Sequence, residues 1–250
     1  MASKPPLDLL FLGSGNAFAA EGRAFSSFLL NGRYLFDCGP TLVQQLRRAD
    51  VSPNDIEVVL ISHFHADHFF GLPFLFLDGK YKGRTKDVLI VGPPGIEERT
   101  EALLRLGYPG VQTEGPLAFQ RRYVEVRDGF EAEVGGLKLT AALVEHVPEL
   151  ECFAFGVEVG GRRLVYSGDS TLCPALLRLV DGAEVIVLEC SCEGVAVHLS
   201  PAGVEQVTRR APTGAKVIVT HLDGDDDPLI RSLSKDAGLL VASDLARFSF

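Results

Sequence analysis

The chain lacks any hydrophobic run long enough to cross a membrane. Its longest apolar stretches have the length of a β-strand and fall short of the ~18 residues typical of a transmembrane helix. The first residues, MASKPP, also lack the apolar segment of a secretory signal peptide. These absences predict a cytoplasmic protein with no membrane partner.

Cysteine is scarce and does not occur in a disulfide pattern. The chain has 5 cysteines, an odd number without framework spacing: Cys38, Cys152, Cys173, Cys190 and Cys192. Cys190 and Cys192 are separated by one residue, whereas zinc-binding pairs usually have two residues between them. We therefore predict that the thiols are reduced and pack as small apolar side chains.

The chain has fewer basic than acidic residues. Lysine and arginine number 24 against 33 aspartates and glutamates, which gives a net charge of −9. An acidic cluster, Asp223–Asp227, follows His221. Because nonspecific grip on nucleic acid normally comes from a basic face, this composition disfavours nucleic acid and favours a small anionic substrate.

Histidine is also rare, yet three of its six copies lie in residues 62–68, with the sequence SHFHADH. This segment follows the apolar run Val58–Ile61, which predicts a buried strand. Alternation directs His63 and His65 to one side, and the following turn sends Asp67 and His68 toward a second position. A separation of ~3.5–4 Å between two such positions is typical of two-metal hydrolytic sites. A His-rich surface turn is the disfavoured alternative.

Each of the other three histidines follows an apolar run that predicts a strand. His146 follows residues 140–145, His198 follows residues 195–197, and His221 ends residues 217–220. A further strand, residues 163–166, leads into Ser167-Gly168-Asp169, where the glycine lets the backbone turn and present a carboxylate. Asp169 is therefore a candidate bridging ligand.

In this order the residues resemble the metallo-β-lactamase superfamily of binuclear hydrolases, over nearly the whole chain. The family pattern is His-x-His-x-Asp-His, then a lone His, a lone Asp and a final His. The resemblance implies one metal site of His63, His65 and His146, a second of Asp67, His68 and His221, and a shared Asp169. It also implies that Asp37 supports the site by hydrogen bonding without touching metal.

The implied cofactors are two divalent metal ions. Imidazole-rich sites with carboxylates suit Zn²⁺, and manganese or iron also accept these ligands. Two ions that share a bridging water supply hydroxide at neutral pH and polarise the oxygen under attack. We therefore predict a metal-dependent hydrolase whose nucleophile is a metal-bridging hydroxide.

Within the superfamily the chain is similar to the tRNA 3′-end processing endonucleases, the ribonuclease Z group. The similarity lies in residues 11–17 and 71–73 and in the segment from Leu188 to Ser200. In that group a Glu and a His from this segment form a pair, and the His donates a proton to the leaving oxygen. The candidate catalytic residues are therefore Asp67, Glu189 and His198. The alternative is that Glu189 only ends a strand and His198 only flanks a helix.

Two departures from that group argue against tRNA cleavage. The connection between Asp169 and Glu189 is too short for the protruding arm that grips tRNA, and the residues after His221 are acidic. We predict a phosphodiesterase acting on a small or single-stranded phosphodiester. The alternatives are a hydrolase of a lactone, ester or aryl sulfate on the same site, and an RNA 3′-end endonuclease without the arm. A non-catalytic metal scaffold is disfavoured because it would not need a complete ligand set.

Periodicity and turns indicate how the chain is arranged. Three- and four-residue spacing predicts helices at Thr41–Arg48, Ile96–Leu106, Leu172–Val180 and Ser200–Arg210. Turn residues predict hairpins at Asn31-Gly32, Asp128-Gly129, Gly135-Gly136 and Gly160-Gly161. These patterns indicate α/β or α+β, and the family resemblance implies α+β with a four-layer αβ/βα sandwich. We expect one domain over residues 1–250, because the ligands span both halves.

Two further segments have open interpretations. Lys80, Lys82, Arg84 and Lys86 alternate with other residues, as in a pocket border that binds an anion or in an exposed edge strand. The phenylalanines around the histidine motif predict core, an apolar pocket wall or a subunit contact. The last of these would suit a homodimer, which is common in the resembled group.

Overall fold

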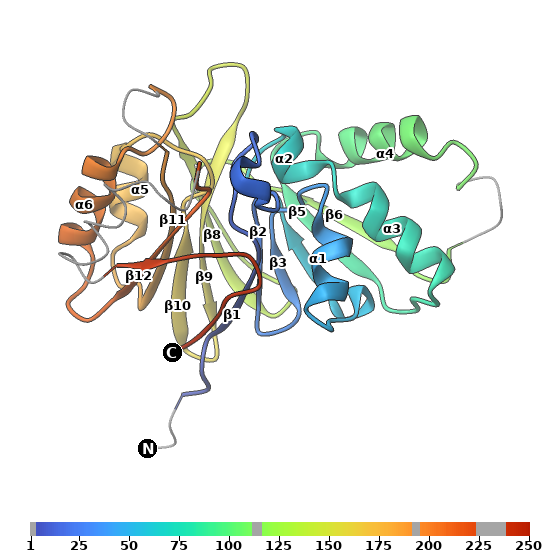
Figure 1. The fold of residues 1–250 in the computed structure, drawn as a ribbon, viewed down its shortest axis with the longest axis horizontal. Coiled ribbons are helices and arrows are strands. Elements are labelled where there is room, and N and C mark those ends of the chain that lie inside the picture. Colours follow the sequence, from blue (N-terminus) through green and yellow to red (C-terminus); the bar gives the residue numbers. More distant parts are fainter. Residues whose placement is uncertain (1–3, 112–116, 192–195, 224–238) are drawn as a thin grey trace.

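Two mixed β-sheets face each other, and helices cover the outer face of each (Figure 1). The computed structural model describes residues 4–111, 117–191, 196–223 and 239–250. Within these residues each sheet has seven strands. The predicted four-layer α+β sandwich is therefore confirmed.

The first sheet has the order β14-β1-β2-β3-β4-β5-β6. Its strands are β1 (Asp8–Gly13), β2 (Ser27–Leu30), β3 (Tyr34–Phe36), β4 (Val58–Leu60), β5 (Val88–Gly92), β6 (Arg121–Glu125) and β14 (Arg247–Ser249). Strands β3 to β6 are parallel. The first three of them are short apolar runs buried on both faces, whereas β6, at the edge of the sheet, is partly exposed. The β2–β3 hairpin turns at Asn31 and Gly32, both with positive φ, as predicted.

The second sheet has the order β13-β12-β11-β10-β9-β8-β7. Its strands are β7 (Phe130–Val134), β8 (Leu137–Val144), β9 (Cys152–Val159), β10 (Arg162–Tyr166), β11 (Val185–Glu189), β12 (Lys216–Thr220) and β13 (Leu240–Val241). Strands β10 to β13 are parallel, whereas β7 to β10 form two antiparallel hairpins through Gly135-Gly136 and Gly160-Gly161.

The helices lie where the periodicity predicts them, with two additions. The structure has α1 (Leu42–Arg48), α4 (Ile96–Gly107), α5 (Pro174–Leu179) and α6 (Pro201–Arg210), as predicted, together with α2 (Ala66–Phe69) and α3 (Leu72–Tyr81). Short 3₁₀ turns occur at Ala20–Gly22 and Pro53–Asp55. Among the described residues, no helix combines the length and hydrophobicity that crossing a membrane requires.

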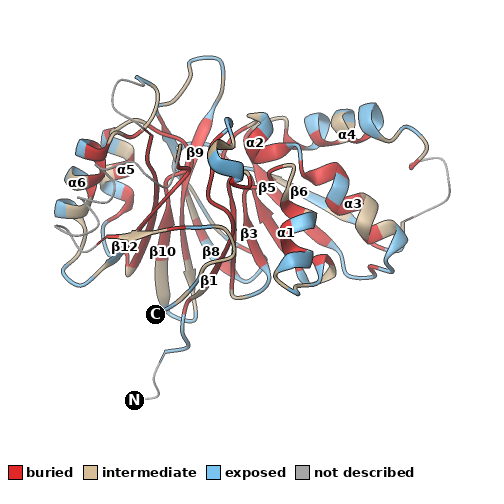
Figure 2. Cartoon of the chain, viewed as in Figure 1, coloured by how far each residue is buried: buried red, intermediate tan, exposed pale blue. Residues whose placement is uncertain are grey.

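Apolar side chains fill three layers between these elements. One cluster lies between the sheets, a second lies under α5 and α6, and a third lies under α1, α3 and α4. The inner strands are buried along most of their length, and the exposed residues lie mainly on the outer helices and loops (Figure 2). Such burial fixes the ends of the parallel strands rigidly, and the candidate site lies at these ends.

Three expectations about local structure were wrong. Asp128-Gly129 does not join a hairpin, because β6 pairs in the first sheet and β7 in the second. The alternating basic segment is no edge strand: Lys80 lies in α3, and the buried Arg84 donates to main-chain carbonyls. Residues 196–198 form a turn instead of continuing a strand. In each case the local pattern fits more than one structure, and the structure adopts another of them.

Candidate metal centre

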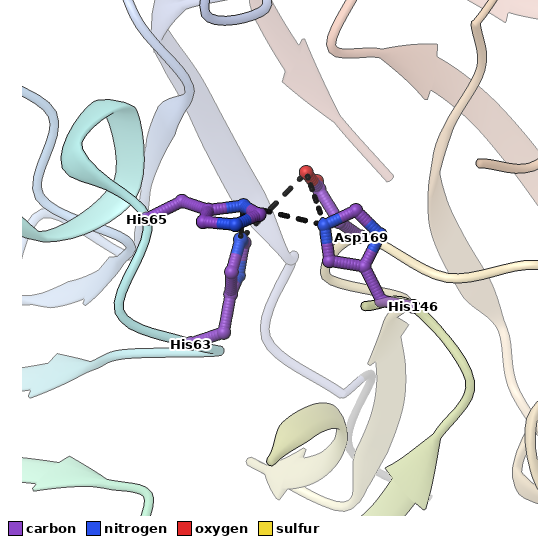
Figure 3. A group of neighbouring side chains, drawn as sticks. All are labelled: His63, His65, His146 and Asp169. Carbon is purple, nitrogen blue, oxygen red and sulfur yellow. Dashed lines mark hydrogen bonds and ion pairs between the residues drawn. The ribbon is translucent and has the colours of Figure 1, made fainter. Parts of the chain in front are cut away.

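Four side chains from both sheets converge in a first group: His63, His65, His146 and Asp169. His63 and His65 follow β4, and His146 follows β8 on the facing sheet. His63 Nε2 lies 2.9 Å from His65 Nδ1, which lies 3.3 Å from His146 Nε2. One ligand atom from each member lies within 4.8 Å of the others (Figure 3).

Asp67, His68 and His221 form a second group. Asp67 and His68 lie on α2, which begins directly after the extended backbone of His65. His221 follows β12 with a φ of 59°, a conformation that turns the chain sharply at the end of the strand. The Asp67 Oδ2 atom lies 3.3 Å from His68 Nε2 and 3.5 Å from His221 Nε2. All three side chains are buried.

Asp169 lies between the two groups. Its Oδ2 atom is 3.3 Å from His221 Nε2, 3.4 Å from His68 Nε2 and 3.8 Å from His63 Nε2. The preceding Gly168 has a φ of 56°, and a Cβ atom there would lie 2.8 Å from the Phe153 carbonyl oxygen. Glycine is therefore required for the turn that presents this carboxylate, as the sequence indicates.

Asp37 makes hydrogen bonds at the base of the second group. Its Oδ1 atom accepts from the Ser62 amide at 2.8 Å, and its Oδ2 atom accepts from Ser62 Oγ at 2.9 Å. The same Oδ2 atom lies 2.7 Å from His68 Nδ1 and accepts from the Tyr166 hydroxyl at 2.7 Å. Asp37 therefore holds His68 by one ring nitrogen and turns the other toward Asp67 and Asp169.

Sequence reasoning missed Ser62, Tyr166 and the Val197 carbonyl. The carbonyl oxygen of Val197 lies 2.6 Å from His146 Nδ1 and orients that ring. Ser62 directly precedes the motif and Tyr166 lies three residues before Asp169, but nothing in their local patterns separates them from ordinary strand residues. Only the packing of the two sheets brings Tyr166 to Asp37.

The donor set fits a divalent cation. In the described part of the chain, His68 Nε2, His221 Nε2 and Asp169 Oδ1 are buried and make no hydrogen bond. Polar atoms buried without such partners are costly in a folded protein. A cation held by these imidazole and carboxylate atoms would satisfy them, and this mixed set suits zinc and its neighbours.

Burial and charge set the protonation of the site. Burial lowers the pKa values of His65 and His146, and burial together with the charge of His68 holds the pKa of His63 well below its usual value. Burial alone would lower the pKa of His68, but the carboxylates around it raise it well above its ordinary value. The histidines of the first group are thus neutral at neutral pH, as metal ligands must be.

Glu189 and His198 lie in contact beside the two groups. His198 Nδ1 lies 3.0 Å from both carboxylate oxygens of Glu189 and 3.9 Å from Asp169 Oδ2. Glu189 is buried at the end of β11 and accepts from the Ser170 amide at 2.7 Å. Burial would lower the pKa of His198, but the hydrogen bond and charge of Glu189 raise it. The reading in which these residues merely end a strand and flank a helix does not account for this contact.

Other sequence-predicted features lie elsewhere or outside the described residues. Lys80 Nζ donates to the Val111 carbonyl at 2.7 Å. Cys38, Cys152 and Cys173 are buried free thiols and Cys190 is buried as well, whereas Cys192 lies outside the described residues. Of the acidic cluster only Asp223 is described, and its carboxylate accepts from the Asn16 amide group at 3.2 Å.

Known proteins resemble this chain in sequence and in fold. The chain is 28% identical to ribonuclease BN of Enterobacter sp. (strain 638), with 88% of this chain and 90% of that protein covered. It is also 28% identical to ribonuclease Z of Methanothermobacter thermautotrophicus, with 86% of each covered. Among solved structures, the metallo-β-lactamase fold protein YhfI from Bacillus subtilis superposes with a TM-score of 0.77, at 19% identity, over 98% of this chain and all of that one.

Fold, donor set and relatives together define a metal-dependent hydrolase of the metallo-β-lactamase fold, similar to ribonuclease Z. The recognition made from the sequence is therefore confirmed at the level of superfamily and group. The chain belongs to the family described as Anti-Pycsar protein Apyc1, which matches residues 7–234.

Proposed function

We propose that the chain is a binuclear metal-dependent phosphodiesterase that acts on small phosphodiesters. The observation that carries this proposal is the arrangement of two ligand groups around Asp169, with the Glu189–His198 pair at their edge. A metal pair alone would serve many hydrolases. A buried carboxylate that holds a histidine beside the metals favours a reaction whose leaving oxygen needs a proton.

One metal ion would be held by His63, His65 and His146, and the other by Asp67, His68 and His221. Asp169 would bind both ions. Two Zn²⁺ ions are the favoured occupants, and when bound they would supply an activated hydroxide and polarise the phosphoryl oxygen. Asp37 would keep His68 oriented, because its carboxylate binds Nδ1 and leaves Nε2 for the metal. No protein nucleophile is needed.

His198 would donate the proton to the leaving oxygen. Its Nδ1 atom is bound to Glu189, so Nε2 is the ring nitrogen left to face a substrate. The His198 side chain is 18% exposed, whereas that of Glu189 is 1% exposed. The carboxylate thus holds the ring and its charge in place, while the ring stays within reach of a bound ligand.

A second candidate is cleavage of RNA 3′ ends, which is favoured by the likeness to proteins named ribonuclease BN and ribonuclease Z. Two observations favour a small phosphodiester over RNA as the substrate. Between Asp169 and β11 the chain forms only the short helix α5, without a protruding arm. The net charge of −9 gives little general attraction for a polyanion.

Hydrolysis of bis(p-nitrophenyl) phosphate tests the proposal. Wild-type protein loaded with two equivalents of zinc or manganese is compared with Asp67→Ala and with the exposed-site control Asp181→Ala. Asp67→Ala should lower kcat/KM at least ~100-fold and lower the bound metal from two ions per chain to one, because it removes a ligand. Asp181→Ala should match the wild type.

The outcome also separates the alternatives. Metal-dependent turnover that Asp67→Ala abolishes would support the phosphodiesterase, and cyclic nucleotides and RNA ends would be tested next. Full metal loading without turnover of this diester would contradict the proposal and favour a lactone, ester or aryl sulfate. Full loading without turnover of any of these would favour a metal-bound scaffold.

A further inference from the structure

The Tyr166 hydroxyl links the two sheets beside the two groups of candidate ligands. Tyr166 ends β10 in the second sheet, whereas Asp37 follows β3 in the first. The Tyr166 hydroxyl donates to Asp37 Oδ2 at 2.7 Å, and both side chains are buried. Asp37 in turn lies 2.7 Å from His68 Nδ1. One residue, Asp37, therefore connects Tyr166 to His68, a side chain that offers a ligand atom.

The position of the Tyr166 hydroxyl is fixed by its surroundings. The Tyr166 ring packs edge-on against Phe28, with centroids 5.3 Å apart, and against Phe36, with centroids 5.8 Å apart. Phe28 and Phe36 are themselves stacked at 4.4 Å. The Ser26 side chain makes a further hydrogen bond to Tyr166. Close packing of this kind leaves the ring one orientation, so the hydroxyl acts as a rigid donor.

We propose that Tyr166 is a positioning residue for the second metal: its hydroxyl fixes the Asp37 carboxylate, which fixes the ring orientation and tautomer of His68. This inference rests on the ligand set proposed above. Asp37 Oδ2 takes part in three hydrogen bonds, to Ser62 Oγ, His68 Nδ1 and the Tyr166 hydroxyl. The tyrosine is the only one of these three partners that comes from the second sheet.

The effect should be specific to the group that contains His68. His146, in the first group, is oriented by the Val197 carbonyl at 2.6 Å and has no contact with Asp37 in the described structure. His63 Nδ1 lies 3.0 Å from Ser62 Oγ, and Ser62 stays bound to Asp37 through its main-chain amide. Loss of the tyrosine hydroxyl would therefore loosen His68 most and the first group least.

The experiment compares metal binding by Tyr166→Phe and Tyr123→Phe. Tyr123 is a matched control because its hydroxyl also donates to a carboxylate, Glu101 Oε1 at 2.8 Å. Tyr123 lies on β6, three strands away from β3 at the edge of the first sheet. Zinc affinity is measured by competition with a chelator, and cobalt spectra report the geometry of each site. The binding step that Asp67→Ala removes identifies the second site.

We expect Tyr166→Phe to weaken zinc at the second site about tenfold, to leave the first site within about twofold, and to change the cobalt absorption of the second site only. Tyr123→Phe should bind both ions as the wild type does. If Tyr166→Phe does not fold, Ser26→Ala, which removes only a partner of the Tyr166 hydroxyl, should weaken the same site in the same direction.

Equal weakening of both sites, or unchanged binding at both, would overturn the positioning role and leave the ligand set standing. A wild type that binds no metal would overturn the proposed function together with this inference. The two failures are distinguishable because metal binding is measured without any substrate.

Discussion

At the scale of single residues, Asp169 is the point on which the site converges. Its Oδ2 atom lies within 4.0 Å of nitrogen atoms from His63, His68, His146, His198 and His221. Burial alone would raise the pKa of Asp169, but His221 and His68 hold it well below its usual range. A carboxylate buried this deeply is tolerated because cationic or polarised groups surround it.

The His198 role predicts a dependence on the leaving group. His198→Ala should lower kcat about 100- to 1,000-fold for a phosphodiester with an alkoxide leaving group, because a positioned general acid contributes on this order. The p-nitrophenolate of bis(p-nitrophenyl) phosphate leaves without a proton, so that substrate should lose less than about tenfold. Steady-state kinetics on both substrates, with metal content checked, makes the comparison. Equal losses on the two substrates would contradict the proton-donor role.

At the scale of elements, the docking of α2 against the loop after β3 sets the second group. The Cys38 amide donates to the His68 carbonyl at 2.7 Å, and the Gly71 amide donates to the Cys38 carbonyl at 2.7 Å. A Cβ atom on Gly71 would lie 2.3 Å from the Gly39 carbonyl oxygen and 2.5 Å from that of Cys38. These contacts are with backbone, so the two segments approach closely only because residue 71 is glycine.

Gly71→Ala should therefore disturb both stability and metal binding. We expect a loss of about 1–3 kcal/mol in the free energy of unfolding, because the methyl group must push the two backbones apart. Zinc affinity at the second site should fall as well, since His68 moves with α2. Denaturant unfolding and a zinc titration measure the two effects. The control is Gly107→Ala at the end of α4, where a Cβ atom meets nothing within 4 Å; a similar loss there would refute the argument.

At the scale of the whole molecule, each sheet supplies half of the site. The first half of the chain contributes His63, His65, Asp67 and His68, and the second contributes His146, Asp169 and His221. The chain also returns to its start: β14 pairs with β1, and Asp244 accepts from the Ser14 amide at 2.9 Å. A ligand bound between the sheets would stabilise their packing.

A single domain over residues 1–250, a homodimer and a cytoplasmic location remain predictions from the sequence.

Metal removal should therefore lower the thermal stability of the whole chain. Zinc at 100 times its dissociation constant adds ~2.7 kcal/mol to the free energy of unfolding, if it binds only the folded state. For a chain of this size that energy corresponds to an increase in Tm of about 5–10 °C. Differential scanning calorimetry with zinc and with a chelator measures it. Asp169→Ala should abolish most of the increase, and Asp181→Ala should retain it; an increase that survives in Asp169→Ala would place the bound zinc elsewhere.

Much of the fold and of the ligand set follows from the sequence because short segments of the chain carry the signals that predict them. The helix bounds follow from apolar spacing, and the Asn31-Gly32 turn follows from the positive φ of both residues. Asp128-Gly129 was predicted wrongly because the same turn signal serves a hairpin and a crossing between sheets. Helix α3 was missed because its apolar residues lie on more than one face, and α2 was missed because its 4 residues are too few to show a helical period.

The sequence by itself determined which residue types are present and in what order: a compact His and Asp motif after one strand, and single ligands after three others. Their order along the chain carries this information, since each follows a recognisable apolar run. Only the tertiary structure decided that Tyr166 reaches Asp37, that Val197 orients His146, and that His198 meets Glu189. The first contact exists because the two sheets pack face to face, whereas the other two are made by a turn at residues 196–198 that has no periodicity to predict it.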